Sequence, residues 1–229
     1  MLFVAVMCYV ILMLFKYLSK KKEEKPETGG IKNIIFDVGQ VLVDYDWETY
    51  LDSFGFEPAK RERIAKATFQ SPVWDERDRG LYEEDVYLKQ FQELDPEDAE
   101  DIEKVIRGTG GTIHKRPYAD TWVKYLKSKG YHLYILSNYA SYMIDHTKKE
   151  LTFRKEMDGE VFSCYVNQLK PEPEIYQTIL DKYQLKPEES VFIDDRPENC
   201  QGAQKQGIHT ICFGDFKQVA ADLEKLGVK

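Results

Sequence analysis

The stretch Ile34-Ile35-Phe36-Asp37-Val38-Gly39-Gln40-Val41-Leu42 decides the fold expected for this chain. It is typical of a short apolar strand that ends directly on an aspartate and continues into a turn containing glycine. In open α/β sheets, ligands bind beyond the carboxyl ends of the strands. Asp37 is therefore a candidate nucleophile.

The rest of the chain alternates between strand-like and helix-like segments. We expect strands at residues 31–36, 131–136, 161–166, 190–193 and 210–213, and helices starting at Pro117, at Glu174 and after Pro197. Strands separated by helices imply βαβ units and a mostly parallel sheet. The predicted fold class is therefore α/β, with a Rossmann-like parallel-sheet core formed by residues 31–46 and 116–229.

The segment from Asp46 to Lys115 has no strand signal of comparable quality. Its apolar residues recur with helical spacing, and Pro72, Gly80 and Pro96 punctuate it. About 70 residues are too many for an ordinary loop. We therefore expect residues 47–115 to form an inserted helical cap.

Composition narrows the class of protein. The chain has 229 residues, 42% of them hydrophobic, which is enough for a full core. The net charge is -8, and residues 1–30 hold five Lys against three Glu, so the acidic excess lies in the folded part. An acidic surface argues against nucleic acid as a partner. The four cysteines form no C-x-x-C pair, which favours small buried side chains in a reducing cytosol over a zinc site or a disulfide framework.

The amino-terminal segment differs from the rest. Residues 2–15 are uniformly apolar, and a lysine cluster at residues 20–22 follows them. We expect residues 1–18 to be a single-pass transmembrane anchor, residues 19–30 a flexible charged linker, and the body to face the cytoplasm. A cleaved signal peptide and a misassigned start codon are the alternatives.

Three further polar sites follow predicted strands or precede a helix. They are the pair Ser137-Asn138, Lys170 within Leu169-Lys170-Pro171-Glu172-Pro173-Glu174-Ile175-Tyr176, and the pair Asp194-Asp195. Each has an ordinary explanation by itself, as a helix N-cap or a solvated lysine. Their combination with Asp37, in this order, is improbable by chance.

Together these motifs resemble the haloacid dehalogenase-like superfamily, whose members carry an Asp nucleophile, a Ser or Thr, a Lys and an acidic pair. The resemblance covers residues 31 to about 213 and includes the cap, which corresponds to a C1-type cap of subfamily IA. The sequences of the lysine and acidic motifs resemble the branch that contains the glucose-1-phosphate phosphatases and the amino-terminal phosphatase domain of soluble epoxide hydrolases. This resemblance implies a phosphatase that acts on a small phosphorylated metabolite such as a sugar phosphate.

The residue types suit that chemistry, because phosphoryl transfer depends on positioning and on charge stabilisation. Asp37 would form an aspartyl phosphate that water then hydrolyses. Lys170 would neutralise the transferring group and keep Asp37 ionised. Ser137 and Asn138 would hold phosphate oxygens.

Magnesium is the expected cofactor, because carboxylates from two strand ends provide the oxygen ligands that Mg²⁺ prefers. The resemblance implies direct ligation by Asp37, Asp195 and the backbone carbonyl of Gly39, with Asp194 in the outer shell. Without a cation, three adjacent carboxylates would repel one another.

Gly39 is also a departure from the family pattern. Most phosphatases of the superfamily have a second Asp there, which protonates the leaving oxygen and then activates water. Loss of such help costs about 10²–10⁴ in rate, so a weakened phosphate-binding sensor or interaction module is the main alternative. Water, a cap residue or a good leaving group could replace the missing acid.

Other residues allow two interpretations. Asp44 and Asp46 could assist the chemistry or could be ordinary turn and helix-start carboxylates. Trp74, in the stretch 74–80, could stack on a substrate or could pack within the cap. Dehalogenation without a metal is disfavoured by the Asp194-Asp195 pair, because extra carboxylates would repel a carboxylate substrate. The sequence does not reveal the oligomeric state.

Overall fold

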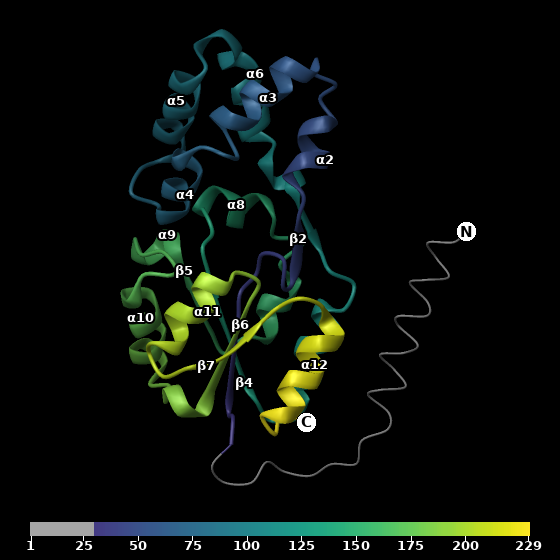
Figure 1. The fold of residues 1–229 in the computed structure, drawn as a ribbon, viewed down its shortest axis with the longest axis vertical. Helices are drawn as coiled ribbons and strands as arrows, with labels where there is room; N and C mark the ends of the chain where they lie inside the picture. Colours follow the sequence, from purple (N-terminus) through teal and green to yellow (C-terminus); the bar gives the residue numbers. More distant parts are fainter. Residues whose placement is uncertain (1–29) are drawn as a thin grey trace, which may run out of the picture.

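The computed structural model describes residues 30–229, and its centre is a parallel sheet of five strands in the order β5-β4-β1-β6-β7 (Figure 1). Because β1 lies in the middle, the chain builds one half of the sheet with β4 and β5 and then crosses to add β6 and β7. Such a change of direction marks the usual ligand site of an open α/β sheet. The strands are β1 (Asn33–Phe36), β4 (His132–Ser137), β5 (Gly159–Phe162), β6 (Ser190–Asp194) and β7 (His209–Cys212).

Helices cover both faces of the sheet, and successive residues of β1 pack on opposite faces. Ile34 and Phe36 belong to a core cluster that includes Trp122 and Val219 from α7 and α12, whereas Ile35 packs in a cluster with α10 and α11. The strands are apolar on both faces because both faces are buried. The helices of this part are α7 (Ala119–Ser128), α8 (Ser141–His146), α9 (Ser163–Val166), α10 (Pro173–Tyr183), α11 (Pro197–Gln204) and α12 (Phe216–Lys225), with short 3₁₀ turns η3 (Thr152–Glu156) and η4 (Pro187–Glu189).

A second group of helices is inserted after β1 and lies beyond the sheet, at the top of Figure 1. A two-stranded antiparallel ribbon of β2 (Val43–Tyr45) and β3 (Ile113–Lys115) carries the chain out and back. These helices enclose a core of their own, built around Leu51, Ile64 and Phe91. They are α2 (Trp47–Asp52), α3 (Pro58–Ala67), α4 (Pro72–Arg79), α5 (Glu84–Leu94) and α6 (Ala99–Arg107), with turns η1 (Pro96–Asp98) and η2 (Thr109–Thr112).

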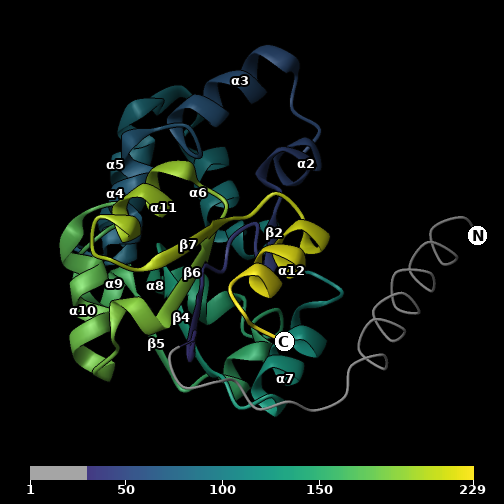
Figure 2. The same ribbon diagram turned by 60° about the horizontal axis from the view of Figure 1, so that its bottom comes forward.

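The rotated view in Figure 2 places α4 on the side of this inserted group that faces the sheet, next to α9. We call the helices α2–α6 the cap below. The cap therefore contacts the rest of the molecule through α4, which holds residues 74–79 of the stretch that the sequence singled out. A second contact comes from α6, where the Arg107 carbonyl accepts a hydrogen bond from the Tyr142 hydroxyl of α8 at 2.7 Å.

The α/β class and the parallel sheet are confirmed, and the predicted helices after Pro117, at Glu174 and after Pro197 are present. The strand predicted at 161–166 is wrong in its second half, because residues 163–166 form α9. Phe162 pairs with Ser137, the last residue of β4, so β5 has no partner backbone beyond that point. The segment from Asp46 to Lys115, which has no strand signal of comparable quality in the sequence, contains one short strand, β3, at its end.

The predicted membrane anchor at residues 1–18 lies outside the described residues, as does nearly all of the predicted linker at 19–30. Within residues 30–229, no helix combines the length and the apolar character that crossing a bilayer requires.

Candidate active site

The candidate site lies at the carboxyl ends of the three central strands. Asp37 directly follows β1, Ser137 is the last residue of β4, and Asp194 is the last residue of β6. Because β1 lies between β4 and β6, these positions are neighbours at one edge of the sheet. Lys170 joins them from the loop between α9 and α10. The structure thus brings all four sequence motifs together.

Lys170 lies between two carboxylates. Its Nζ is 2.9 Å from Oδ1 of Asp37 and 2.7 Å from Oδ2 of Asp194. The side chains of Lys170 and Asp194 are 1% and 0% exposed, so water contributes almost nothing to their solvation. A buried charge of this kind is stable only when partners compensate it.

Asp194 already has a full set of partners. Its Oδ1 accepts hydrogen bonds from the backbone NH of Arg196 at 2.8 Å and from Nδ2 of Asn199 at 3.0 Å, and Oδ2 accepts from Lys170 and, at 3.1 Å, from Asn199. Asp194 therefore acts here as an anchor for Lys170. The neighbouring Asp195 is only partly buried.

The charges within the cluster shift the pKa values of Asp37 and Lys170. Burial raises the pKa of Asp37, and the Asp194 charge raises it further, while Lys170 and a hydrogen bond from Ser137 oppose the rise. Burial alone would lower the pKa of Lys170, but the charges of Asp194 and Asp37 outweigh it and raise that pKa. Lys170 is therefore held as an ammonium ion beside the candidate nucleophile.

Asn138 fixes the backbone of the lysine motif. Its Nδ2 donates to the carbonyl of Lys170 at 3.0 Å, and its Oδ1 accepts from the backbone NH of Lys170 at 2.9 Å. These two bonds align the segment after β4 with the loop that carries the lysine. The direct contact of Asn138 with phosphate stays a prediction, since its amide is engaged in this way.

The donor set fits a divalent cation. Asp37, Asp194 and Asp195 each offer one carboxylate oxygen, and the three oxygens lie within 4.8 Å of one another. The Gly39 carbonyl accepts a hydrogen bond from the Val41 NH at 2.7 Å, which leaves its second lone pair available. Oxygen donors at this spacing suit Mg²⁺.

The backbone conformation does not require a glycine at position 39. Its φ is not positive, and a Cβ placed on it meets nothing within 4 Å. The neighbouring Gln40 adopts the left-handed conformation instead, with φ 55°. The absence of a carboxyl group at position 39 is therefore a chemical difference and not a steric necessity.

The other candidates are engaged outside this cluster. Asp46 caps α2 through a hydrogen bond from the Thr49 NH at 3.0 Å, and Asp44 pairs with Arg116 at 2.9 Å. Trp74 lies in an aromatic cluster, with ring centroids 4.9 Å from Phe69, 6.2 Å from Tyr45 and 6.3 Å from Phe91. Asp46 is thus a helix-start carboxylate, and substrate stacking by Trp74 stays a prediction.

Sequence reasoning missed two supporting elements. Asn199, which donates to both carboxylate oxygens of Asp194, follows it by five residues, after Asp195-Arg196-Pro197-Glu198. Its place in the first turn of the helix predicted after Pro197 was a usable signal. Arg79 of the cap forms a two-pronged ion pair with Glu172 of the lysine motif, at 2.9 and 2.8 Å. No local pattern predicts that contact, because it joins two separate parts of the fold.

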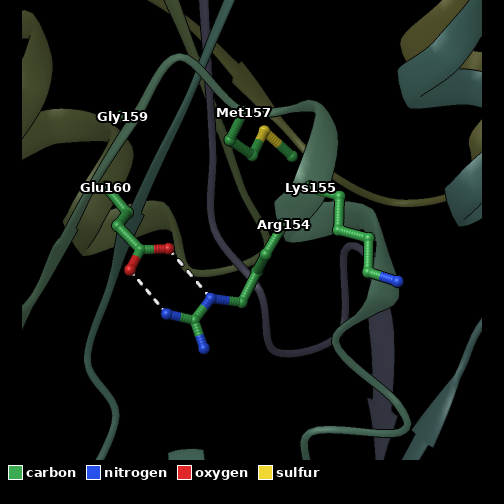
Figure 3. A pocket seen from close by; sticks show the side chains of 5 residues that line it. All are labelled: Arg154, Lys155, Met157, Gly159 and Glu160. Atoms are coloured by element: carbon green, nitrogen blue, oxygen red, sulfur yellow. Dashed lines mark hydrogen bonds and ion pairs between the residues drawn. The ribbon is translucent and has the colours of Figure 1, made fainter.

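A separate surface hollow begins at the amino end of β5 and is shown in Figure 3. Arg154, Lys155, Met157, Gly159 and Glu160 line it, and Arg154 and Glu160 pair with each other at 2.9 and 2.5 Å. None of the strand-end residues described above contributes to it. We therefore place the chemistry at the strand ends.

An aspartate beside a buried ammonium group, at the point where a parallel sheet reverses its strand order, is suited to covalent hydrolytic catalysis. That is the class of protein that the fold and the site define. The family model described as haloacid dehalogenase-like hydrolase matches residues 31–207. The chain belongs to this family, as the motifs predicted, and is a hydrolase.

Several characterised proteins are similar in sequence. Flavin mononucleotide hydrolase 1 of Arabidopsis thaliana is 25% identical over 92% of this chain and 83% of its own length. D-ribitol-5-phosphate phosphatase of Bacteroides thetaiotaomicron is 26% identical over 79% of this chain and 90% of its own length. Bifunctional epoxide hydrolase 2 of Rattus norvegicus is 34% identical over 44% of this chain, but the match spans only 19% of that protein.

Solved structures show the same fold. A HAD-family enzyme from Bacteroides thetaiotaomicron, in complex with magnesium and inorganic phosphate, superposes with a TM-score of 0.66 at 23% identity, over 83% of this chain and 99% of that chain. The L-2-haloacid dehalogenase from Xanthobacter autotrophicus superposes with a TM-score of 0.60 at 17% identity, over 87% and 84% of the two chains.

Proposed function

We propose that this protein is a Mg²⁺-dependent phosphatase that hydrolyses a small phosphorylated metabolite, such as a sugar phosphate, through an aspartyl-phosphate intermediate. The observation that carries the proposal is the position of Lys170 between Asp37 and Asp194, with the Asp195 carboxylate within reach. The names of the flavin mononucleotide hydrolase and the ribitol-5-phosphate phosphatase support the same reaction class.

Each of these side chains would have a separate role in the reaction. Asp37 would attack phosphorus as the carboxylate, and the Lys170 ammonium group 2.9 Å away opposes the rise in its pKa that burial causes. Lys170 would stabilise negative charge on the transferring group, and the Ser137 hydroxyl would hold one of its oxygens. Asp194 would position Lys170 and would not touch the substrate.

Asp37, Asp195 and the Gly39 carbonyl would hold Mg²⁺, because the oxygens of Asp194 already have partners from Lys170, Arg196 and Asn199. When bound, the ion would supply positive charge that offsets the repulsion among the carboxylates and the phosphate.

Phosphate release by the full-length chain tests the proposal. We expect release from a panel of sugar phosphates and from p-nitrophenyl phosphate, loss of release with EDTA, and its return with Mg²⁺. A matched control is Asp181→Asn, at a position on the outer face of α10 where the side chain is exposed. Binding of phosphates without release would favour the sensor alternative, and metal-independent halide release from 2-haloacids would favour dehalogenation.

We also propose that residues 1–18 tether the enzyme to a membrane with its catalytic part facing the cytoplasm. The apolar run and the lysines that follow it support this. The full chain should sediment with membranes, and deletion of residues 1–30 should release it to the supernatant. Co-sedimentation of the deleted chain, or its aggregation, would contradict the proposal.

A further inference from the structure

The site as described lacks a group that can protonate the leaving oxygen. Gly39 has no side chain, and Asp44 and Asp46 are held by Arg116 and by the amino end of α2. An alkoxide is a poor leaving group, so hydrolysis of an alkyl phosphate needs a proton donor. The cap is the other part of the molecule that could supply such a carboxyl group.

The cap helix α4 contacts the core through its last turn. The Asp78 carbonyl accepts a hydrogen bond from the Ser163 hydroxyl at 2.5 Å, and the same hydroxyl oxygen accepts from the Tyr139 NH at 2.9 Å. Tyr139 comes two residues after Ser137 in the chain. Asp78 is thereby tied to the segment that leaves β4 at the candidate site.

The residues after Asp78 reinforce this attachment. The carbonyls of Arg79 and Gly80 both accept hydrogen bonds from Nδ2 of Asn167 at 3.0 Å, and Arg79 forms its ion pair with Glu172. Gly80 has φ 72°, and a Cβ there would lie 2.7 Å from the Cα of Cys164. The end of α4 therefore has a defined position on the core, which proton transfer requires.

The carboxyl of Asp78 lies within hydrogen-bonding reach of the backbone amide of Ala140, three residues after Ser137 at the end of β4. The charge of Asp37 adds to the rise in the pKa of Asp78, and the charges of both aspartates add to the rise in the pKa of Tyr139. By contrast, Asp75 is exposed and Glu76 pairs with Arg79.

We propose that Asp78, supplied by the cap, is the general acid and base of the reaction, in place of the carboxyl group missing at Gly39. This inference rests on the proposed phosphatase function. As Asp37 attacks phosphorus and the bond to the leaving oxygen breaks, the Asp78 carboxyl gives its proton to that oxygen, which departs as an alcohol. The Asp78 carboxylate then takes a proton from water, whose oxygen attacks the aspartyl phosphate, so that inorganic phosphate leaves, the Asp37 carboxylate is restored and Asp78 is protonated again.

The surroundings of Asp78 favour a proton at neutral pH. Burial raises its pKa to about 7, with Asp75 and Asp37 adding to the rise and Arg77 opposing it. The other titratable groups that face it are Tyr45 from β2, Tyr139 after β4 and Cys164 of α9, and burial raises the pKa of all three. Asp78 can thus give and regain a proton within the range in which enzymes work.

Leaving-group dependence tests the inference with Asp78→Asn in the full-length chain. The kcat/KM for the sugar phosphate that the wild type cleaves fastest should fall by about 10²–10⁴. The kcat/KM for p-nitrophenyl phosphate should fall by about tenfold or less, because its leaving group needs no proton and this parameter does not include the later attack of water on the aspartyl phosphate, a step common to both substrates. The control Glu93→Gln, at an exposed position of the cap helix α5, should leave both activities unchanged. Equal losses on the two substrates would indicate a structural role and would overturn the inference.

Two further measurements keep the test decisive if that variant folds poorly. In the wild type, kcat/KM for the sugar phosphate should fall above pH 7 while that for p-nitrophenyl phosphate does not, and parallel profiles would overturn the inference. In the double variant with Gly39→Asp, the new carboxyl should restore much of the lost sugar phosphate activity. If the wild type cleaves neither substrate, the proposed function itself fails; if it cleaves both and Asp78→Asn does too, only this inference fails.

Discussion

The ammonium nitrogen of Lys170 lies 2.9 Å from Oδ1 of Asp37, although the two residues are far apart in the chain. Both side chains are nearly inaccessible to water, so the attraction between them is weakly screened. The candidate nucleophile is therefore built into the core as half of an ion pair. Its reactivity and the stability of the fold depend on the same contact.

Replacing Lys170 should make that dependence measurable. Lys170→Met removes the charge and leaves Asp37 and Asp194 buried without it, which should lower the free energy of unfolding by about 3–5 kcal/mol at pH 7.5. Urea denaturation with EDTA present measures this loss. The loss should shrink at pH 5, because the orphaned carboxylates can take up protons. The control Lys148→Met, at a side chain that is 68% exposed, should change stability little; an equally small change for Lys170→Met would contradict the argument.

Asp37→Asn should abolish turnover without unfolding the protein. The substitution keeps the size of the side chain and an oxygen that can accept the 2.7 Å hydrogen bond from the Val38 NH, but an amide cannot form the aspartyl phosphate. We expect phosphate release at the background rate, alongside an unchanged circular dichroism spectrum. Retention of activity on p-nitrophenyl phosphate would refute the nucleophile assignment.

Gly39→Asp should be accepted by the structure. A Cβ at this position meets nothing within 4 Å, and the backbone carbonyl proposed to bind Mg²⁺ is retained. The Mg²⁺ concentration needed for half-maximal activity should therefore stay within about threefold of the wild-type value, which is under 1 kcal/mol. A loss of metal affinity of tenfold or more would argue against ligation by the Gly39 carbonyl.

Asp78→Asn should stabilise the protein at high pH. The pKa of Asp78 rises from 3.8 to about 7 on folding, so the folded state binds the proton more tightly than the unfolded chain. Stability from this group is then present at low pH and is lost as the pH rises through about 4 to 7. Asparagine does not titrate, so the melting temperature of the variant, relative to that of the wild type, should increase between pH 4 and pH 8. A difference in melting temperature that stays constant with pH would show that folding does not raise the pKa of Asp78.

Gly80→Ala should displace the cap. An alanine at position 80 would be strained by the φ of 72°, and its Cβ would also clash with Cys164. At Gly55 the φ is 66°, but an added Cβ meets nothing within 4 Å. Gly55→Ala therefore isolates the backbone cost, about 1–2 kcal/mol. We expect Gly80→Ala to lose more stability and to lower the kcat for sugar phosphates, because Asp78 precedes it by two residues. Equal effects of the two substitutions, measured by denaturation and by turnover, would count against tight docking of α4.

The parallel core could be predicted from the sequence because its signals are local. Apolar runs such as Val191-Phe192-Ile193 are buried on both faces, and the motifs of Asp37, Ser137 and Asp194 lie at or directly after the last residue of a strand. The helix α9 at residues 163–166 could not be predicted, because its start depends on where the neighbouring strand β4 ends. The roles of Asp44 and Asp46 were equally open, since only the positions of Arg116 and α2 distinguish the two interpretations.

What the sequence determined by itself was the set of reactive groups: Asp37, Ser137 and the pair Asp194-Asp195 at strand ends, and Lys170 in a loop before a helix. Only the tertiary structure decided which carboxylates face Lys170, which of them also bonds to Asn199, and which end of α4 docks on the core. The physical reason is that periodicity and turn propensity act over a few residues, whereas burial and charge pairing depend on surfaces that meet only after the sheet and the cap have docked.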